Sequence, residues 1–249
     1  MRSFLVGLQF LTRIHIDAQT EWKEEDFGKS VSWFPVIGWI VGILLCTIYF
    51  FMKPLNIPLL TGFILVISEL AITGATLADG LMDSSDGLFS GRSRERSLEI
   101  MKDSLIGAFG LLSILVVTFL KTFSLAAADS YMYLLLIAMP TIGRLNLVIS
   151  ICEYPYARPY GIGRAFAVHR SPHAVSFAVL AAFLPALYFG YVYVILMGAS
   201  LVLGLFLNRW IVGKIGGVTG DTYGFVTEIT EAFIAFLFII IVKGGAWHI

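Results

Sequence analysis

The chain has 249 residues, of which 58% are hydrophobic and 14% are charged, and its mean hydropathy is +0.86. Soluble domains contain about 45–50% apolar and about 25% charged residues, so this composition excludes an ordinary soluble protein and indicates a multi-spanning membrane protein. The 17 basic and 17 acidic residues cancel, which excludes a nucleic-acid-binding protein that acts by phosphate neutralisation.

The first residues predict a short amphipathic helix at the membrane interface. Phe4, Leu8 and Leu11 follow the i, i+4, i+7 spacing of one helix face. This apolar stretch is short, Arg13 follows it directly and no small-residue cleavage site is present, so a signal peptide is not expected.

Long apolar stretches predict an all-α fold, a polytopic integral membrane helical bundle. A helix needs about 20 mostly apolar residues to cross about 30 Å of hydrocarbon. About seven stretches, within a range of six to eight, meet this requirement: 31–51, 59–78, 105–128, 131–151, 174–189, 190–208 and 225–242. No polar loop separates the stretches that meet at residue 190. We expect a single membrane-embedded catalytic domain over residues 1–249.

The basic residues predict that the N-terminus is cytoplasmic. Cytoplasmic loops next to membrane spans carry an excess of Lys and Arg. With the N-terminus inside, most of the 17 basic residues fall in cytoplasmic segments and two fall outside. Two more, Lys121 and Arg144, lie within the expected spans.

Three aspartates follow the second apolar stretch. Asp79, Asp83 and Asp86 have the i, i+4, i+7 spacing that places side chains on one face if the helix continues. Like charges at this spacing destabilise a helix, and burial near a bilayer raises the cost. A hard cation such as Mg²⁺ or Mn²⁺, itself bound to a phosphate, would relieve the repulsion. We therefore expect a metal site here, and the alternative is a solvated acidic helix end.

The next segment is basic and suits a phosphorylated substrate. Arg92, Arg94 and Arg96 could bind phosphate through their forked guanidinium groups, with Lys102 as a further candidate. The positive-inside rule alone would also place arginines here. Asp103 could contact a metal or could stabilise the start of the third span.

Two further arginines belong to the later part of the chain. Arg144 lies inside the fourth stretch, where an arginine is expensive and indicates a functional cavity unless the side chain snorkels to the interface. Arg158 lies in a segment rich in glycine and proline, with aromatic residues at its edges. This segment could hold a nucleotide or a ring ligand, although its composition alone favours a structural loop.

A glycine-rich segment, residues 216–224, is the last polar element. Gly217 and Gly220 would allow the backbone to approach a phosphate closely. Asp221 and Glu228 could complete a metal shell or serve as a base. Elsewhere we expect Glu69 to pair with Lys121. All four polar elements share one membrane face in this orientation, which indicates metal-dependent chemistry on a phosphorylated substrate.

The polar segments resemble those of the cobalamin synthase family. Residues 79–88 resemble its D-G-L-x-D-x-x-D-G-L motif, and residues 98–104 with Gly107 resemble its L-E-I-M-K-D-S-x-x-G block. Residues 10–13, 34–35, 156–159 and 217–221 with Glu228 are similar to its other signatures. Two departures occur. Leu77 replaces a frequent histidine, which puts a histidine base in doubt, and Leu105 replaces a basic residue, which loosens one phosphate contact.

The resemblance implies adenosylcobinamide-GDP ribazoletransferase activity with Mg²⁺ as cofactor. The 3′-hydroxyl of α-ribazole, or of α-ribazole 5′-phosphate, would attack the phosphate attached to cobinamide and release GMP. Asp79, Asp83 and Asp86 would hold the metal, and Asp103, Asp221 and Glu228 would be candidates for a second metal or for the base. The resemblance also implies an inner (plasma) membrane location with the site on the cytoplasmic side, and a homo-oligomer or an assembly with other late cobalamin enzymes.

Other classes of membrane protein share parts of this pattern. CDP-alcohol phosphotransferases carry D-x-x-D-G-x-x-A-R, and residues 83–87 match its opening, but residues 88–91 replace the A-R stretch. An intramembrane prenyltransferase is a weaker alternative. A cation-coupled transporter would place its carboxylates near the membrane midplane and would contain internal repeats. In this sequence the carboxylates lie towards one face and no repeat is present.

Overall fold

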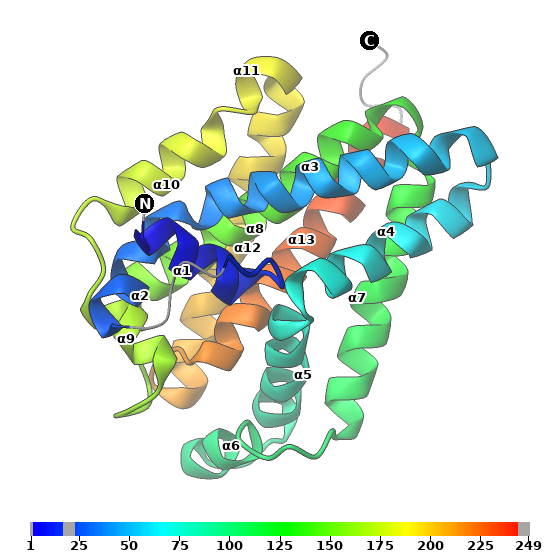
Figure 1. Cartoon of the computed structure of the whole chain (residues 1–249). Helices are drawn as coiled ribbons and strands as arrows, with labels where there is room; N and C mark the ends of the chain where they lie inside the picture. The colour runs from blue at the N-terminus through cyan, green and yellow to red at the C-terminus, as the bar shows by residue number, and fades with distance from the viewer. Residues whose placement is uncertain (1, 17–22, 244–249) are drawn as a thin grey trace.

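The computed structural model describes residues 2–16 and 23–243, and these residues form a bundle of helices (Figure 1). The helices are α1 (Arg2–Leu11), α2 (Glu24–Ser30), α3 (Phe34–Met52), α4 (Pro58–Thr73), α5 (Thr76–Phe89), α6 (Arg94–Ile100), α7 (Ala108–Ala126), α8 (Met132–Glu153), α9 (Ile162–Val168), α10 (Ala174–Phe183), α11 (Ala186–Phe189), α12 (Tyr191–Ile215) and α13 (Gly220–Lys243). The expected all-helical fold is therefore confirmed.

Five helical segments in the described residues are long and apolar enough to cross a membrane. They are Glu24–Leu55, Ala108–Ala126, Asp129–Glu153, Tyr191–Ile215 and Gly220–Val242. The pair α4 and α5 makes a sixth if it is taken as one broken span. The described residues therefore give five or six candidate spans, and six, the lower end of the expected range, is reached when α4 and α5 are taken as one span. The stretch 174–189 forms only α10 and α11, which together are too short to span, and Gly190 at φ 72° separates them from α12.

The expected continuous helix over residues 59–78 is wrong, because the chain bends by 95° between α4 and α5. Gly74 and Ala75 both adopt left-handed backbone conformations, with φ of 65° and 56°. The side chain of Arg13 lies directly against Gly74, so a Cβ atom at this position would collide with it. Glycine therefore ends α4 here. As a result α5 turns away from α4 and runs beside α7 and α13 (Figure 1).

Glycines set the closest helix contacts around the centre of the bundle. The helix α8 is buried over most of its length and packs against α3, α10, α12 and α13. Between α5 and α13, a Cβ atom on Gly80 would lie 2.6 Å from the carbonyl oxygen of Asp221, and one on Gly224 would collide with the carbonyl of Leu77. This close approach brings the aspartates of α5 next to the first turn of α13.

The N-terminal helix forms over Arg2–Leu11 as predicted. Leu8 and Leu11 are buried, and α1 packs against α2 and α3. Phe4 makes an edge-on contact with Trp33, with ring centroids 5.7 Å apart. Part of the apolar face thus contacts protein. The location of α1 at the membrane interface and the cytoplasmic orientation of the N-terminus stay predictions.

Candidate functional site

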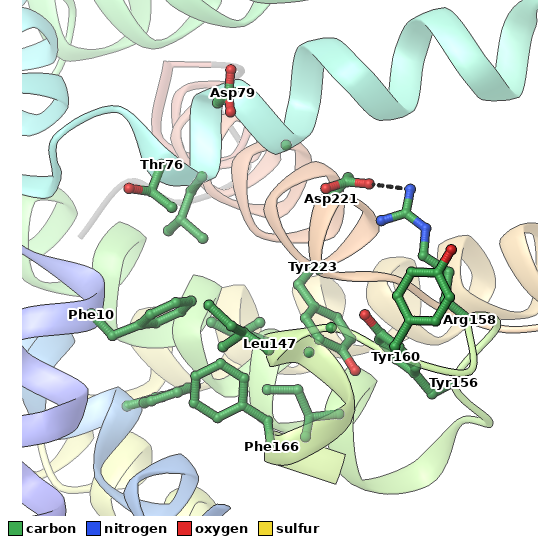
Figure 2. Close-up of a pocket in the computed structure, with 18 of the residues that line it drawn as sticks. Phe10, Thr76, Asp79, Leu147, Tyr156, Arg158, Tyr160, Phe166, Asp221 and Tyr223 are labelled. Carbon is green, nitrogen blue, oxygen red and sulfur yellow. Dashed lines mark hydrogen bonds and ion pairs between the residues drawn. The ribbon is translucent and has the colours of Figure 1, made fainter. Parts of the chain in front are cut away.

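A cavity of about 380 Å³ lies where α5, the loop after α8, α9 and the first turn of α13 meet (Figure 2). Five residues that the sequence singled out contribute to its wall: Asp79, Lys102, Arg158, Gly220 and Asp221. The structure therefore brings together residues from four separate segments of the chain. The other wall is apolar and includes Phe10, Leu147 and Phe166.

An ion pair connects two sides of this cavity. Nη2 of Arg158 donates to Oδ2 of Asp221 at 2.7 Å, and both side chains are partly buried (Figure 2). The loop that carries Arg158 is held by two backbone hydrogen bonds to Val218, at 2.8 Å each. Gly217 is buried behind this contact. The contact requires glycine, because a Cβ atom there would lie 2.5 Å from the carbonyl oxygen of Pro155. Gly217 thus positions the loop, whereas Gly220 lines the cavity.

The start of α13 is fixed by two threonines that the sequence analysis did not single out. Thr219 Oγ1 accepts from the backbone N–H of Thr222 at 3.2 Å, and Thr222 Oγ1 accepts from the backbone N–H of Thr219 at 2.8 Å. This reciprocal pair is a capping arrangement, and Asp221 lies between the two threonines in the first turn. A carboxylate is favoured at this end of a helix by the helix dipole. A T-x-x-T segment after glycines was the available signal.

The aspartates of α5 share one face of the helix, as their spacing predicted. Asp79 is exposed and lines the cavity, while Asp83 is half-buried and within electrostatic range of Asp79, Asp221 and Asp86. Within residues 2–16 and 23–243, no three His, Cys, Asp or Glu side chains are arranged around one point as a complete metal cage. The chain thus brings carboxylates from α5 and α13 into one region without forming a complete metal cage among the described residues.

Asp86 contacts the start of α7. Its two carboxylate oxygens accept hydrogen bonds from the backbone N–H groups of Gly107 at 2.7 Å and Gly110 at 2.9 Å. Both partners are glycines, and a side chain on either would occupy the space of the carboxylate. Asp103, which we considered for this helix start, is exposed, and its Oδ1 accepts from the backbone N–H of Leu105 at 3.1 Å. Asp86 therefore stabilises the α7 terminus.

The basic residues divide into two groups. Arg92, Arg94 and Arg96 are exposed outside the cavity, and Arg96 pairs with Glu99 at 2.8 Å. Lys102 lies at the cavity, where its Nζ donates to the hydroxyl of Tyr160 at 3.0 Å. This hydrogen bond and the charge of the lysine lower the pKa of the Tyr160 phenol. Lys102 thus connects the segment after α6 to the Arg158 loop.

The structure places Glu228 and Arg144 away from the cavity, in a buried cluster of charges. Lys121 Nζ lies 2.9 Å from Glu228, 2.6 Å from Glu231 and 3.3 Å from Glu69, which confirms the expected pairing of Glu69 with Lys121. Arg144 Nη1 lies 2.9 Å from Glu231. Glu228 follows Asp221 by seven residues, about 10 Å along α13. This cluster joins α4, α7, α8 and α13.

The apolar wall of the cavity depends on phenylalanines that received no role from the sequence. Phe166 is almost fully buried and contacts Phe10, Phe27 and Phe34 edge-on, with ring centroids 4.8, 5.5 and 5.7 Å apart. Phe10 and Phe34 belong to segments 10–13 and 34–35, which resemble family signatures, and this resemblance was the available signal. Edge-on aromatic contacts of this kind hold rings in fixed orientations.

Comparisons with known proteins agree on one family. Residues 3–239 match the family model described as cobalamin-5-phosphate synthase (CobS). The chain is 37% identical to the adenosylcobinamide-GDP ribazoletransferase of Desulfitobacterium hafniense, over 93% of this chain and 94% of the relative. It is 32% identical to the same enzyme of Fusobacterium nucleatum, over 97% and 98%, and 32% identical to that of Brevibacillus brevis, over 99% of each. No solved structure matches the chain.

Proposed function

Because this chain belongs to the cobalamin-5-phosphate synthase family, we propose that it joins adenosylcobinamide-GDP to α-ribazole and releases GMP. The structural observation that carries the proposal is the common cavity of Asp79, Arg158 and Asp221, which come from three of the segments that resemble family motifs. A cavity with carboxylates, an arginine and an apolar wall suits the transfer of a phosphate group to a nucleoside.

We propose that Mg²⁺ serves as the cofactor and that Asp79 and Asp83 hold it, with Asp221 opposite. Mg²⁺ usually takes one or two carboxylates from the protein and completes its shell with water and substrate phosphates. Two carboxylates one turn apart on α5, without a full protein cage, suit this coordination. When bound, the ion would neutralise charge on the pyrophosphate. Asp86 has both oxygens engaged by α7, so we assign it a supporting role.

The residues of the chain then have separate tasks in the transfer. Arg158 binds a phosphate group of the substrate, and Asp221 holds the guanidinium of Arg158 in place. The ribose 3′-hydroxyl oxygen forms the new bond to the phosphorus attached to cobinamide while the bond to GMP breaks. Among the three carboxylates considered as the base, only Asp221 lines the cavity in the described residues, so we propose that it accepts the hydroxyl proton.

We propose that the cavity faces the cytoplasm of a cell whose inner membrane contains this bundle. Arg92, Arg94, Arg96 and Lys102 lie on the segment whose lysine contacts the Arg158 loop through Tyr160. An excess of basic residues at one end of a bundle is typical of the cytoplasmic side. α-Ribazole 5′-phosphate would be accepted in the same way as α-ribazole if its 5′-phosphate extends from the cavity.

The proposal is tested by GMP release from the purified protein in liposomes. The assay contains adenosylcobinamide-GDP, α-ribazole and Mg²⁺, and each component is omitted in turn. We expect release only when all three are present. Folded protein that releases no GMP under these conditions would overturn the proposal, and CDP-linked donors would then test the CDP-alcohol phosphotransferase alternative.

A further inference from the structure

Five charged side chains lie in the interior of the bundle, and the proposed transfer uses none of them. Glu69, Lys121 and Arg144 belong to α4, α7 and α8, and Glu228 and Glu231 both belong to α13. Each of the five residues is at most 5% exposed. The helices α7, α8 and α13 lie in segments that are long and apolar enough to cross a membrane. Charges in such a place are compensated by one another rather than by bulk water.

The formal charges of this cluster do not cancel. If every group is ionised, three glutamates face one lysine and one arginine, and one negative charge stays uncompensated. A buried carboxylate without an opposite charge is so unfavourable that the group takes up a proton instead. The centre of the cluster has no room for a metal ion, because Lys121 Nζ lies there, 2.6, 2.9 and 3.3 Å from oxygens of the three glutamates.

The contacts of the three glutamates differ, and the difference identifies the group that carries the proton. Glu231 accepts from both cations, from Lys121 at 2.6 Å and from Arg144 at 2.9 Å. Glu228 lies 2.9 Å from Lys121. Glu69 has the longest contact with the lysine, at 3.3 Å through Oε2, and its buried Oε1 accepts no hydrogen bond from the described residues.

Glu69 and Glu231 are also in hydrogen-bond contact with each other. An ionised carboxylate only accepts hydrogen bonds, so two carboxyl groups can form such a bond only when one of them carries a proton to donate. Two carboxyl groups that share one site are therefore not both ionised. Because Glu231 has two cationic partners and Glu69 has one, Glu231 is the better place for the negative charge.

We propose that this cluster is a proton-binding site inside the bundle, and that Glu69 holds the proton and donates it in a hydrogen bond to the carboxylate of Glu231. With Glu69 neutral, two carboxylates face two cations and the charges of the cluster cancel. Oε2 of the neutral Glu69 still accepts from Lys121. This inference depends on the interior of the bundle and is independent of the proposed function.

Substitution by glutamine separates the two carboxyl groups, because glutamine has nearly the shape of glutamate and no charge. In Glu69→Gln the amide can donate to Glu231 and accept from Lys121, so we expect the unfolding midpoint in detergent to stay within about 2 °C of the unmodified protein. Glu231→Gln removes the charge that both Lys121 and Arg144 contact, so we expect the midpoint to fall by at least about 6 °C.

Two results for Glu69→Gln would overturn the assignment of the proton. A fall of the midpoint as large as that of Glu231→Gln would mean that Glu69 is an ionised partner of Lys121. A rise of more than about 2 °C would mean that the substitution relieves repulsion, and thus that all three glutamates are charged.

Infrared spectroscopy detects the proton directly and does not require Glu231→Gln to fold. A protonated carboxyl group has a carbonyl stretching band that is separate from the bands of ionised carboxylates and amides. In a detergent without ester groups at neutral pH, we expect the unmodified protein to show this band and Glu69→Gln to lose intensity in it. Glu95→Gln is the control, because Glu95 is an exposed residue of α6 and its substitution should leave the band unchanged. An identical band in folded Glu69→Gln would overturn the proposal.

Discussion

Arg158 and Asp221 lie 63 residues apart in the sequence, yet the guanidinium of one donates to the carboxylate of the other at 2.7 Å. The pair joins the loop after α8 to the first turn of α13. The two hydrogen bonds of Val218 hold that loop in register with the helix start. The carboxylate of Asp221 thus holds the guanidinium of Arg158 in position at the cavity, and we assign both residues to the same reaction.

Replacement of Arg158 should impair catalysis more than folding. We expect Arg158→Lys to lower kcat/KM for GMP release about 100-fold, because an ammonium group cannot contact Asp221 and phosphate oxygens in the planar, forked geometry of arginine. Arg164→Ala is the control, since Arg164 is exposed nearby and does not line this cavity. If both variants behave alike in the GMP assay, Arg158 is not a phosphate ligand.

The metal assignment predicts a strong effect at Asp83. We expect Asp83→Ala to lower turnover about 100-fold and to raise the Mg²⁺ concentration needed for half-maximal rate, because one ligand and one charge are lost. Glu95→Gln removes an exposed carboxylate on α6 and should change neither quantity. A loss below about tenfold at Asp83, smaller than the loss typical of residues that only support metal ligands, would remove it from the metal site.

Asp86 should behave differently from Asp83, although both lie on the acidic face. Asp86→Ala removes the acceptors of two backbone N–H groups at the start of α7, so we expect the free energy of unfolding to fall by about 1–3 kcal/mol. Asp86→Asn keeps one acceptor and should lose less. Thermal unfolding in detergent measures both effects. Abolished turnover at an unchanged unfolding midpoint would instead show that Asp86 binds the metal, as its spacing first suggested.

The sequence predicted which residues share the acidic face, because a period of 3.6 residues decides this within one helix. It could not predict the role of Asp86, which depends on a helix that begins 22 residues later at Ala108. The 95° bend between α4 and α5 could not be predicted either, since a glycine inside an apolar stretch is a weak signal. The side chain that requires glycine at position 74 is Arg13, which lies far away in the sequence.

The structure places Glu228 and Arg144 in the buried interior of the bundle. The sequence had indicated the site for Glu228 because it follows the glycine-rich segment, and for Arg144 because an arginine inside a span is costly. Both lie in spans with several polar residues, and their helical faces point to Lys121 and Glu231 rather than to the cavity. The sequence did indicate that Glu69 and Lys121 are partners, because both lie inside apolar stretches, where a charged side chain needs one of opposite charge. It did not show that three carboxylates share one lysine.

Removal of Lys121 should destabilise the bundle strongly. Lys121→Met leaves Glu69, Glu228 and Glu231 buried with fewer positive partners, and we expect a loss of about 3–5 kcal/mol in unfolding free energy. Lys29→Met is the matched control, because Lys29 pairs with Glu25 at 3.5 Å on the surface, where such a pair contributes about 0–1 kcal/mol. Similar unfolding midpoints for the two variants would contradict a structural role of the buried cluster.

Gly80 and Asp221 make the contact that sets the distance between α5 and α13. A Cβ atom on Gly80 would lie 2.6 Å from the carbonyl oxygen of Asp221, and backbone cannot move aside as a flexible side chain can. Gly80→Ala should therefore push the two helices apart and separate Asp79 and Asp83 from Asp221. We expect GMP release to fall at least about tenfold, since a shift of about 1 Å at a catalytic group can cost more than this.

The control for Gly80 is a glycine of α12 with open space around it. A Cβ atom on Gly198 would meet no heavy atom within 4 Å, so Gly198→Ala should keep full activity and gain about 0.5–1 kcal/mol from helix propensity. Activity and thermal unfolding are measured on both variants in the same liposomes. Full activity of folded Gly80→Ala would mean that the spacing of α5 and α13 does not govern the reaction. Loss of activity without loss of fold would show that catalysis depends on this spacing.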